Sequence, residues 1–240
     1  MSKEQVYVAK GKAPWFNSDW FDIDKVISMN RSDSGYTTVV CDDNITDMAY
    51  MFRDCSNITS LDLSNFDTSN VTNMKFMFSD CSSLTALDLS NFDTSKVHNM
   101  RHMFLECSDL TKLDLSNFNT PNVTNMCGMF SDCYKLISLN LSSFNTSKVY
   151  DMYGMFDSCS NITSLDLSNF DTSNVEDMSY MFDNCPNLTT IKGTIDMKSC
   201  KLYRDMFDRC PKLRDVKIKN PPTNFEKYSR LSKSQYTIVS

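Results

Sequence analysis

Apolar residues recur along this chain with a fixed period of 26 residues, and the frame is Met-x-x-Met-Phe-x-x-Cys-x-x-Leu-x-x-Leu-x-Leu-x-x-Phe. A fixed period in this range predicts a repeat solenoid, in which each repeat buries its apolar side only by stacking on its neighbours. Pairs of methionines three residues apart, each pair followed by Phe, mark the six full copies: Met48/Met51, Met74/Met77, Met100/Met103, Met126/Met129, Met152/Met155 and Met178/Met181.

The second copy shows which elements one repeat contains. Its Leu-x-x-Leu-x-Leu spacing over residues 84–89 predicts a short strand that points alternate side chains inward. Residues 91–95 are Asn, Phe, Asp, Thr and Ser, a composition typical of a turn. Residues 71–74 predict a second short strand. Apolar offsets of one and three over residues 77–81 predict a single helical turn.

Two polar or reactive columns follow the same period. An Asn or Asp precedes the first Met of every copy, and we expect this column to face inward and to satisfy backbone groups at a corner. Seven of the ten cysteines occupy one repeat position, which predicts reduced thiols in the core: Cys55, Cys81, Cys107, Cys133, Cys159, Cys185 and Cys210.

The repeated stretch Met-Phe-x-x-Cys-x-x-Leu-Thr-x-Leu-Asp-Leu-Ser-x-Phe-Asp-Thr-Ser-x-Val-x-x-Met resembles the BspA-like leucine-rich repeats of surface lipoproteins and adhesins. These occur in bacteria, mycoplasmas and some protists. The resemblance covers about residues 44–220 and implies a right-handed, leucine-rich-repeat-like β-solenoid. It also implies binding to other proteins, often host matrix proteins, without enzymatic activity.

The two ends depart from the period and predict caps. Residues 1–43 form the predicted N-terminal cap, with one helix suggested by the apolar group from Trp15 to Ile27 and a first strand over residues 35–41. Residues 44–220 hold six full repeats and one shortened repeat, and residues 221–240 form the predicted C-terminal cap, with a helix over 225–231. Caps at both ends are expected because an open stack would expose unpaired strand edges.

Charge is distributed unevenly along the chain. The formal net charge is −6 and the isoelectric point is about 4.9, which argues against direct binding of nucleic acid. Residues 44–199 contain 9 basic and 19 acidic side chains, whereas residues 200–240 contain 10 basic and 4 acidic ones. The repeats are therefore acidic and the C-terminal end is basic.

No apolar run at the N-terminus is long enough for a signal peptide, and no 18-residue apolar stretch predicts insertion into a membrane. As written, the sequence predicts a cytoplasmic protein. A longer natural precursor would instead place it at the surface or outside the cell.

Positions that vary between the copies are candidates for a function beyond stacking. Three such columns lie next to each other around the methionine pair and predict one lateral face, rich in residue types common at interfaces. Scattered surface aromatics also occur without any function. The predicted protein-binding residues are Tyr50, Phe76, Arg101, His102, Tyr150, Tyr153 and Tyr180.

A second candidate is an acidic column on the predicted sheet. Like charges in register repel, so such a column hints at a role in meeting a basic partner, binding cations or imitating a nucleic-acid backbone. The simpler interpretation is that solvated carboxylates keep an exposed sheet soluble. The column comprises Asp62, Asp88, Asp114 and Asp166, with Asn140 at the fourth position.

The sequence contains few of the residues and motifs that indicate an enzyme. The chain has two histidines and five glycines, and no phosphate-binding glycine loop, nucleophile elbow or paired zinc motif is present. His98, His102 and Cys127 are placed to approach one another, as a weak metal site or as a thiol activated by a nearby cation. We expect no catalytic residue, no metal and no cofactor.

The sequence thus predicts a non-enzymatic solenoid that binds, and can block, another protein. Two alternatives remain open: a cell-surface adhesin for host proteins, and an acidic inhibitor from a phage or mobile element that targets a nucleic-acid-binding protein. The oligomeric state is left open.

Overall fold

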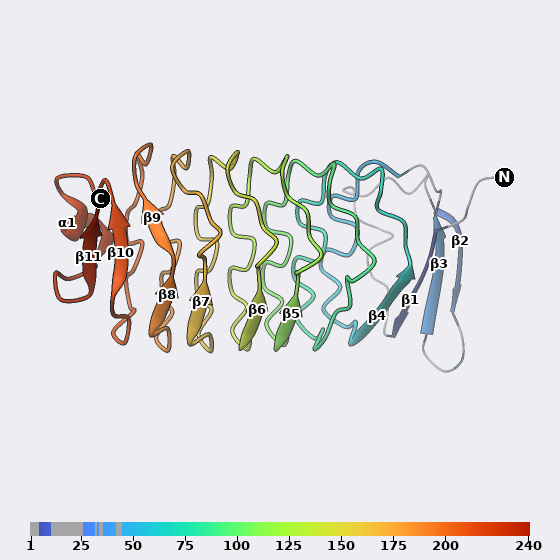
Figure 1. Cartoon of the computed structure of the whole chain (residues 1–240). Coiled ribbons are helices and arrows are strands. Elements are labelled where there is room, and N and C mark those ends of the chain that lie inside the picture. Colours follow the sequence, from blue (N-terminus) through green and yellow to red (C-terminus); the bar gives the residue numbers. More distant parts are fainter. Residues whose placement is uncertain (1–4, 11–25, 32, 34–35, 42–44) are drawn as a thin grey trace.

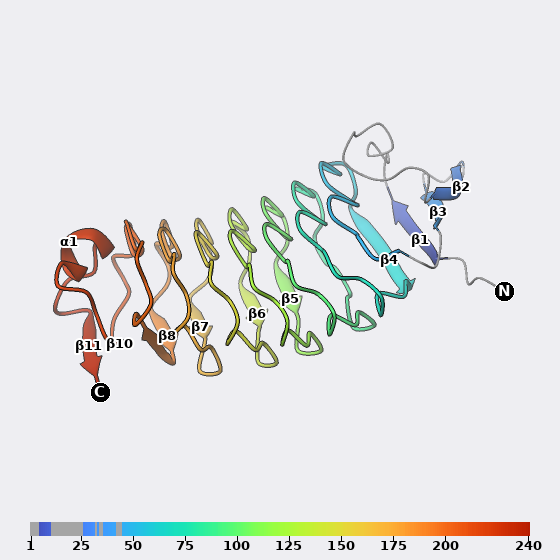
Figure 2. The same cartoon turned by 90° about the horizontal axis from the view of Figure 1, so that it is seen from above.

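The chain forms a single row of stacked coils, one for each repeat, with the two termini at opposite ends of the row (Figure 1). Seen from above, the row curves gently (Figure 2). The computed structural model describes residues 5–10, 26–31, 33, 36–41 and 45–240. The predicted repeat solenoid is confirmed.

Each coil carries its Leu-x-Leu segment on the same side of the row, but only some of these segments form regular strands. The strands of the coils are β4 (Ser60–Asn65), β5 (Lys112–Asp114), β6 (Ser138–Asn140), β7 (Ser164–Asp166) and β8 (Thr190–Lys192). Strands β5 and β6 pair in parallel, as do β7 and β8.

The predicted strand over residues 84–89 is absent, although its three leucines are buried. At this point a cavity of about 240 Å³ lies between Leu61–Ser64 and Asp88–Asn91. The side-chain amide of Asn91 donates to the carbonyls of Leu63 and Phe66 at 2.9 and 2.8 Å. A side chain therefore makes the connection that a strand ladder makes elsewhere.

The core is the set of apolar columns that the repeat frame predicts. One phenylalanine of each coil stacks on the equivalent ring of the next, with centroids 5.3–5.7 Å apart and rings nearly parallel. The methionine pairs and most leucines around this stack are almost completely buried, while Leu139 is partly buried. The stacked rings are Phe52, Phe78, Phe104, Phe130, Phe156, Phe182 and Phe207.

The predicted helical turn at the corner of each coil is wrong. In the second coil, residues 74–81 instead form three overlapping β-turns, and Phe76 and Asp80 have left-handed φ angles of 57° and 62°. With these two left-handed residues, the overlapping turns point every second N–H toward the next coil. The N–H groups of Met74, Phe76 and Phe78 accordingly donate to carbonyls one repeat further on. A helix would have used these groups within its own turn.

The cysteine column satisfies backbone carbonyls in the core. Each thiol from the second coil onward donates to the Phe carbonyl of the preceding coil at 2.9–3.2 Å, as Cys107 does to Phe78. All seven cysteines of this column are free thiols. Burial raises the pKa of the Cys107 thiol well above its usual value, which keeps it protonated as a donor.

The Asn/Asp column forms isolated parallel bridges between the coils. Its side chains accept from the backbone N–H two residues further on, as Asn99 does from Arg101 at 3.0 Å. This capping role was predicted, but the inward orientation was wrong, because these residues are exposed or half-buried. The surface location is consistent with the Asp residues in this column, because a carboxylate at the surface keeps its contact with water.

At the N-terminal end, a sheet extends the first coil. Strands β1 (Gln5–Lys10), β2 (Val26–Arg31) and β3 (Tyr36–Cys41) form an antiparallel sheet with β4, in the order β2-β3-β1-β4. Strand β3 lies in the segment predicted as a strand. The predicted helix falls mostly on residues 11–25, outside the described residues, but its last two positions, Val26 and Ile27, belong to β2.

At the C-terminal end, β9 (Thr194–Asp196), β10 (Val216–Lys219) and β11 (Tyr236–Val239) form a parallel sheet in the order β11-β10-β9. The helix α1 (Phe225–Ser229) covers the last coil and buries Phe225. It is shorter than predicted, because Arg230 has a left-handed φ of 66° and ends it. No helix among the described residues is long and apolar enough to cross a membrane.

Candidate binding surfaces

The lateral face predicted from the varying columns lies on the corner turns. In the first three coils, one aromatic ring of each coil contacts the ring of the next. The Tyr50 and Phe76 rings are stacked with centroids 5.0 Å apart, and the Phe76 and His102 rings are tilted by 42° with centroids 4.8 Å apart. All three residues have left-handed backbones, with φ between 54° and 64°. We call Tyr50, Phe76 and His102 the first aromatic group.

Glycine takes the same left-handed position in the next two coils, at Gly128 and Gly154. A Cβ added to Gly128 would lie 2.1 Å from Nδ1 of His102, so the imidazole already fills that space. The stack therefore ends at His102 because its ring folds over the glycine of the following coil.

Aromatic side chains resume in the fifth and sixth coils, with Tyr180 in the same column as the first aromatic group and Tyr153 in the adjacent column. The rings of Tyr153 and Tyr180 lie 5.4 Å apart and tilted by 59°. Tyr153 is 42% exposed and Tyr150 is 51% exposed. We call Tyr150, Tyr153 and Tyr180 the second aromatic group. The rings of five of the seven predicted residues thus contact one another in two groups. Of the other two, Tyr150 is exposed three residues before Tyr153, and Arg101 is exposed next to His102.

Cations cover the first aromatic group. The Arg53 guanidinium lies 5.6 Å from the Tyr50 ring centroid and 5.4 Å from that of Phe76, and Lys75 Nζ lies 5.3 Å from the Tyr50 centroid. Such cation–π contacts hold flexible side chains over the rings. Sequence reasoning missed Arg53, although its column varies between Arg, Ser, Leu and Asp in the copies and could have been included by the same rule.

The predicted approach of His102 and Cys127 occurs, with 3.8 Å between Nε2 and Sγ. The predicted activation of the thiol is wrong: burial raises the pKa of Cys127 to about 12, and the nearby Arg101 offsets only part of this. Burial, followed by the charge of Arg101, lowers the pKa of His102. Among the described residues, no group of three metal-ligating side chains is suitably placed to hold an ion.

The acidic sheet column is exposed, and its carboxylates have a structural use. Each Asp accepts from the N–H of the Ser two residues further on, as Asp88 does from Ser90 at 2.9 Å. This bond lowers the pKa of the Asp88 carboxyl. Asp62, Asp114 and Asp166 do the same, and Asp166 also pairs with Lys192 at 3.3 Å. Turn formation accounts for the column without a ligand.

A second row of acidic side chains lies along the corner turns, and neighbouring charges in it raise the pKa values of Glu106 and Asp157. The row comprises Asp80, Glu106, Asp132, Asp157 and Asp183. Burial, and then the charges of Asp80 and Asp132, raise the pKa of Glu106. Burial raises the pKa of Asp157 to about 6, and the charge of Asp183 contributes. The row ends at Arg209, whose guanidinium binds Asp183 through two bonds of 3.2 and 2.6 Å.

Comparison with known protein families gives a match that covers the repeats. Residues 35–135 and 106–220 match the family described as Mycoplasma protein of unknown function, DUF285. The chain belongs to the DUF285 family. The two matches overlap and together cover all the coils, while α1 and β11 of this DUF285 protein lie beyond them. Comparison with curated proteins and with solved structures gives no significant match.

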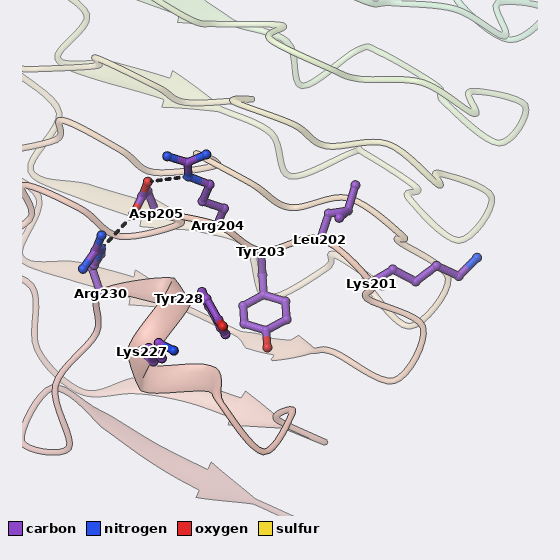
Figure 3. A pocket seen from close by; sticks show the side chains of 8 residues that line it. All are labelled: Lys201, Leu202, Tyr203, Arg204, Asp205, Lys227, Tyr228 and Arg230. Carbon is purple, nitrogen blue, oxygen red and sulfur yellow. Dashed lines mark hydrogen bonds and ion pairs between the residues drawn. The ribbon is translucent and has the colours of Figure 1, made fainter.

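The C-terminal end of this DUF285 protein contains a pocket of about 520 Å³ between the last coil and α1 (Figure 3). Four cationic side chains line it, Lys201, Arg204, Lys227 and Arg230, together with one carboxylate, Asp205. Its apolar lining consists of Leu202, Tyr203 and Tyr228. Sequence reasoning did not single out these residues, although the excess of basic side chains after residue 200 was a signal for them.

Proposed function

We propose that this DUF285 protein is a non-enzymatic protein-binding solenoid that engages its partner through the lateral face formed by the two aromatic groups. The observation that carries the proposal is the backbone of that face. Tyr50, Phe76, His102 and Tyr180 hold left-handed φ angles, a conformation that costs a bulky residue about 1 to 2 kcal/mol.

This strain is not required by the fold. Gly128 and Gly154 occupy the same position in the same conformation at little conformational cost, and their coils stack like the others. Four aromatic side chains at a position suited to glycine therefore need a further explanation, and a surface that presents rings to a partner provides one.

The composition of the face supports a protein partner. Tyrosine and arginine are enriched among the residues that contribute most to protein interfaces, since their large side chains lose little conformational freedom on binding. Tyr150 and Tyr153 are half-exposed without covering the core. They present apolar area that a partner would bury.

A second version of this function, an adhesin for host proteins, is favoured by the family match together with the resemblance to BspA-like repeats. It uses the same face and differs in where the partner is found.

Site-specific photocrosslinking tests the proposal. A photoreactive phenylalanine analogue replaces Tyr153 in one protein and Ser90, on the exposed sheet side, in a control. Each protein is added to a lysate of the source cells and, separately, to purified extracellular-matrix proteins. We expect one discrete crosslinked species from position 153 and none from position 90.

Competition separates binding from chance proximity. Excess unlabelled protein should remove the crosslinked species, whereas the double variant Tyr153→Ala/Tyr180→Ala should not. Equal crosslinking from both positions, or none from position 153 in either mixture, contradicts the proposal. A species found only with matrix proteins favours the adhesin version.

A further inference from the structure

The pocket at the C-terminal end combines charges and apolar surface in an order that suits one kind of ligand. Asp205 lies between two arginines and accepts from Nε of Arg204 at 3.1 Å and from Nε of Arg230 at 2.7 Å (Figure 3). Within the described part of the chain, neither guanidinium makes another side-chain hydrogen bond. Each therefore keeps its terminal amino groups for an anion.

The carboxylate at the centre holds these arginines in place. The side chain of Asp205 is 14% exposed, whereas those of Arg204 and Arg230 are 75% and 58% exposed. The Arg230 guanidinium, ahead of that of Arg204, holds the pKa of Asp205 below its usual value. One carboxylate thus orients two guanidinium groups, which leaves this side of the pocket with net positive charge.

Arg230 occupies its place at a conformational cost. It ends α1 with a left-handed φ of 66°, at a helix terminus where glycine is the usual residue. The side chain that this backbone carries reaches Asp205 on the last coil, so α1 and the coil both contribute to the cationic side.

The other side of the pocket is apolar. The Tyr203 and Tyr228 rings meet edge to face with centroids 6.2 Å apart, and Leu202 beside them is 57% exposed. Lys227 Nζ lies 4.9 Å from the Tyr228 ring centroid. Lys201 extends away from this group in Figure 3 and pairs with Glu176 at 2.9 Å.

We propose that this pocket binds a short acidic peptide segment of a partner protein, with a carboxylate on the Arg204–Arg230 pair and a neighbouring apolar side chain against Leu202, Tyr203 and Tyr228. A volume of about 520 Å³ is within the range of ligand pockets and accommodates a few side chains. The binding site adjoins the lateral face, since the Tyr180 N–H donates to the Arg204 carbonyl, but it is lined by different side chains. It is a second contact for the proposed protein-binding function, on which the inference rests.

Charge favours a short acidic peptide over a nucleic acid. The repeats carry 19 acidic and 9 basic side chains, so a long polyanion leaving the pocket would meet a repelling surface. A peptide places only one or two carboxylates in the pocket, and its apolar residues use the aromatic side.

The test uses fluorescence anisotropy with a labelled, end-blocked hexapeptide of alternating phenylalanine and glutamate. The same peptide with glutamine in place of glutamate, and a six-nucleotide oligothymidylate, serve as comparison probes. We expect the glutamate peptide to bind at least tenfold more tightly than either. No saturable binding of the glutamate peptide, or tighter binding of the oligonucleotide, overturns the proposal.

Substitutions at the exposed Leu202 provide a matched pair that leaves the core intact. Leu202→Glu should weaken binding of the glutamate peptide about tenfold or more by repulsion, whereas Leu202→Lys should leave it equal or stronger. The double variant Arg204→Gln/Arg230→Gln should also lose at least about tenfold, because charge-assisted hydrogen bonds are lost. Lys96→Gln/Lys148→Gln, remote from the pocket, should change affinity less than twofold.

Peptide binding at the pocket can be tested separately from crosslinking at the lateral face. The variant Tyr153→Ala/Tyr180→Ala should bind the hexapeptide as the unaltered protein does, even if its crosslinking partner is lost. Equal effects of Leu202→Glu and Leu202→Lys, or of the pocket and remote double variants, would show nonspecific attraction and refute the site.

Discussion

The middle coils and the last coil share one backbone pattern but differ in the residues on it. In the sixth coil, Met178 is buried in the core and Tyr180 lies on the lateral face. One coil further, the equivalent positions are Tyr203 and Asp205, which line the C-terminal pocket. Backbone hydrogen bonds continue through both regions. The N–H of Tyr180 donates to the carbonyl of Arg204 on the next coil, and the N–H of Phe207 donates to the carbonyl of Ser229, the last residue of α1.

The comparison shows which residues the stack requires. Columns that are the same in every coil form the core and the turns, and the last coil departs from them where no further coil follows. Tyr203 is free to face a pocket because α1, rather than another methionine, covers it. Where the repeat pattern is lost at an end of the stack, side chains released from the core can therefore line a binding site.

The largest expected effect tests the core of the middle coils. Phe104 stacks between Phe78 and Phe130 at 5.6 and 5.7 Å, so Phe104→Ala should lower the free energy of unfolding by about 3 to 5 kcal/mol. Phe207→Ala should cost less, because Phe207 has a stacked ring on one side only. Urea denaturation followed by circular dichroism measures both. Equal losses would mean that the end is packed like the middle.

The next effect concerns the ion pair between Arg209 of the last coil and Asp183 of the acidic row. Arg209→Gln should lower the free energy of unfolding by about 2 kcal/mol, since Asp183 is nearly buried and would lose its bidentate partner. Arg204→Gln is the matched control, because its guanidinium is more exposed and Asp205 retains Arg230. Thermal denaturation at pH 7 compares the two. A loss no greater for Arg209→Gln than for Arg204→Gln would contradict this prediction.

A third prediction tests the boundary between the two aromatic groups. Gly128→Ala should destabilise the protein by about 1 to 3 kcal/mol, through the left-handed φ and the clash with the His102 ring. His102→Ala removes the clash, so the double variant should lose less than the sum of the single losses. Gly154→Ala is the control, because it has a similar φ and no atom closer than 3.7 Å. Strict additivity at position 128 would mean that only the backbone conformation matters.

The period made the core predictable, because each Met, Phe, Cys and Leu could be checked against five further copies. The corner turn was not predictable by this means. Apolar offsets of one and three, as at Met77, Phe78 and Cys81, fit a helical turn and also fit overlapping turns, and only the left-handed φ at Phe76 separates the two.

The binding surfaces divide in the same way. Tyr50 and Tyr153 were found by comparing copies, since variation within a repeat position indicates freedom from the core. Arg230 and Tyr228 have no internal copies, and their approach to Asp205 depends on how α1 folds back onto the last coil. Strand β1 escaped prediction for the same reason, because its partner β4 is fixed by tertiary pairing.

The smallest effect compares Asp157 with Asp183, one coil apart in the acidic row. Asp183 binds Arg209, whereas the one side-chain hydrogen bond of Asp157 within the described residues comes from Ser158 at 3.0 Å. Burial raises the pKa of Asp157 to about 6 from an ordinary value of 3.8. The folded state then binds a proton more tightly than the unfolded state, so Asp157 reduces stability as the pH rises from about 4 to about 6.

Asp157→Asn should therefore raise the free energy of unfolding at pH 7 by about 1 kcal/mol, since screening at a partly exposed side chain limits the effect. At pH 3.5 the variant and the original protein should unfold at the same urea concentration. A gain of equal size at both pH values would show that the amide acts through packing, and that the charge of Asp157 is as well tolerated as that of Asp183.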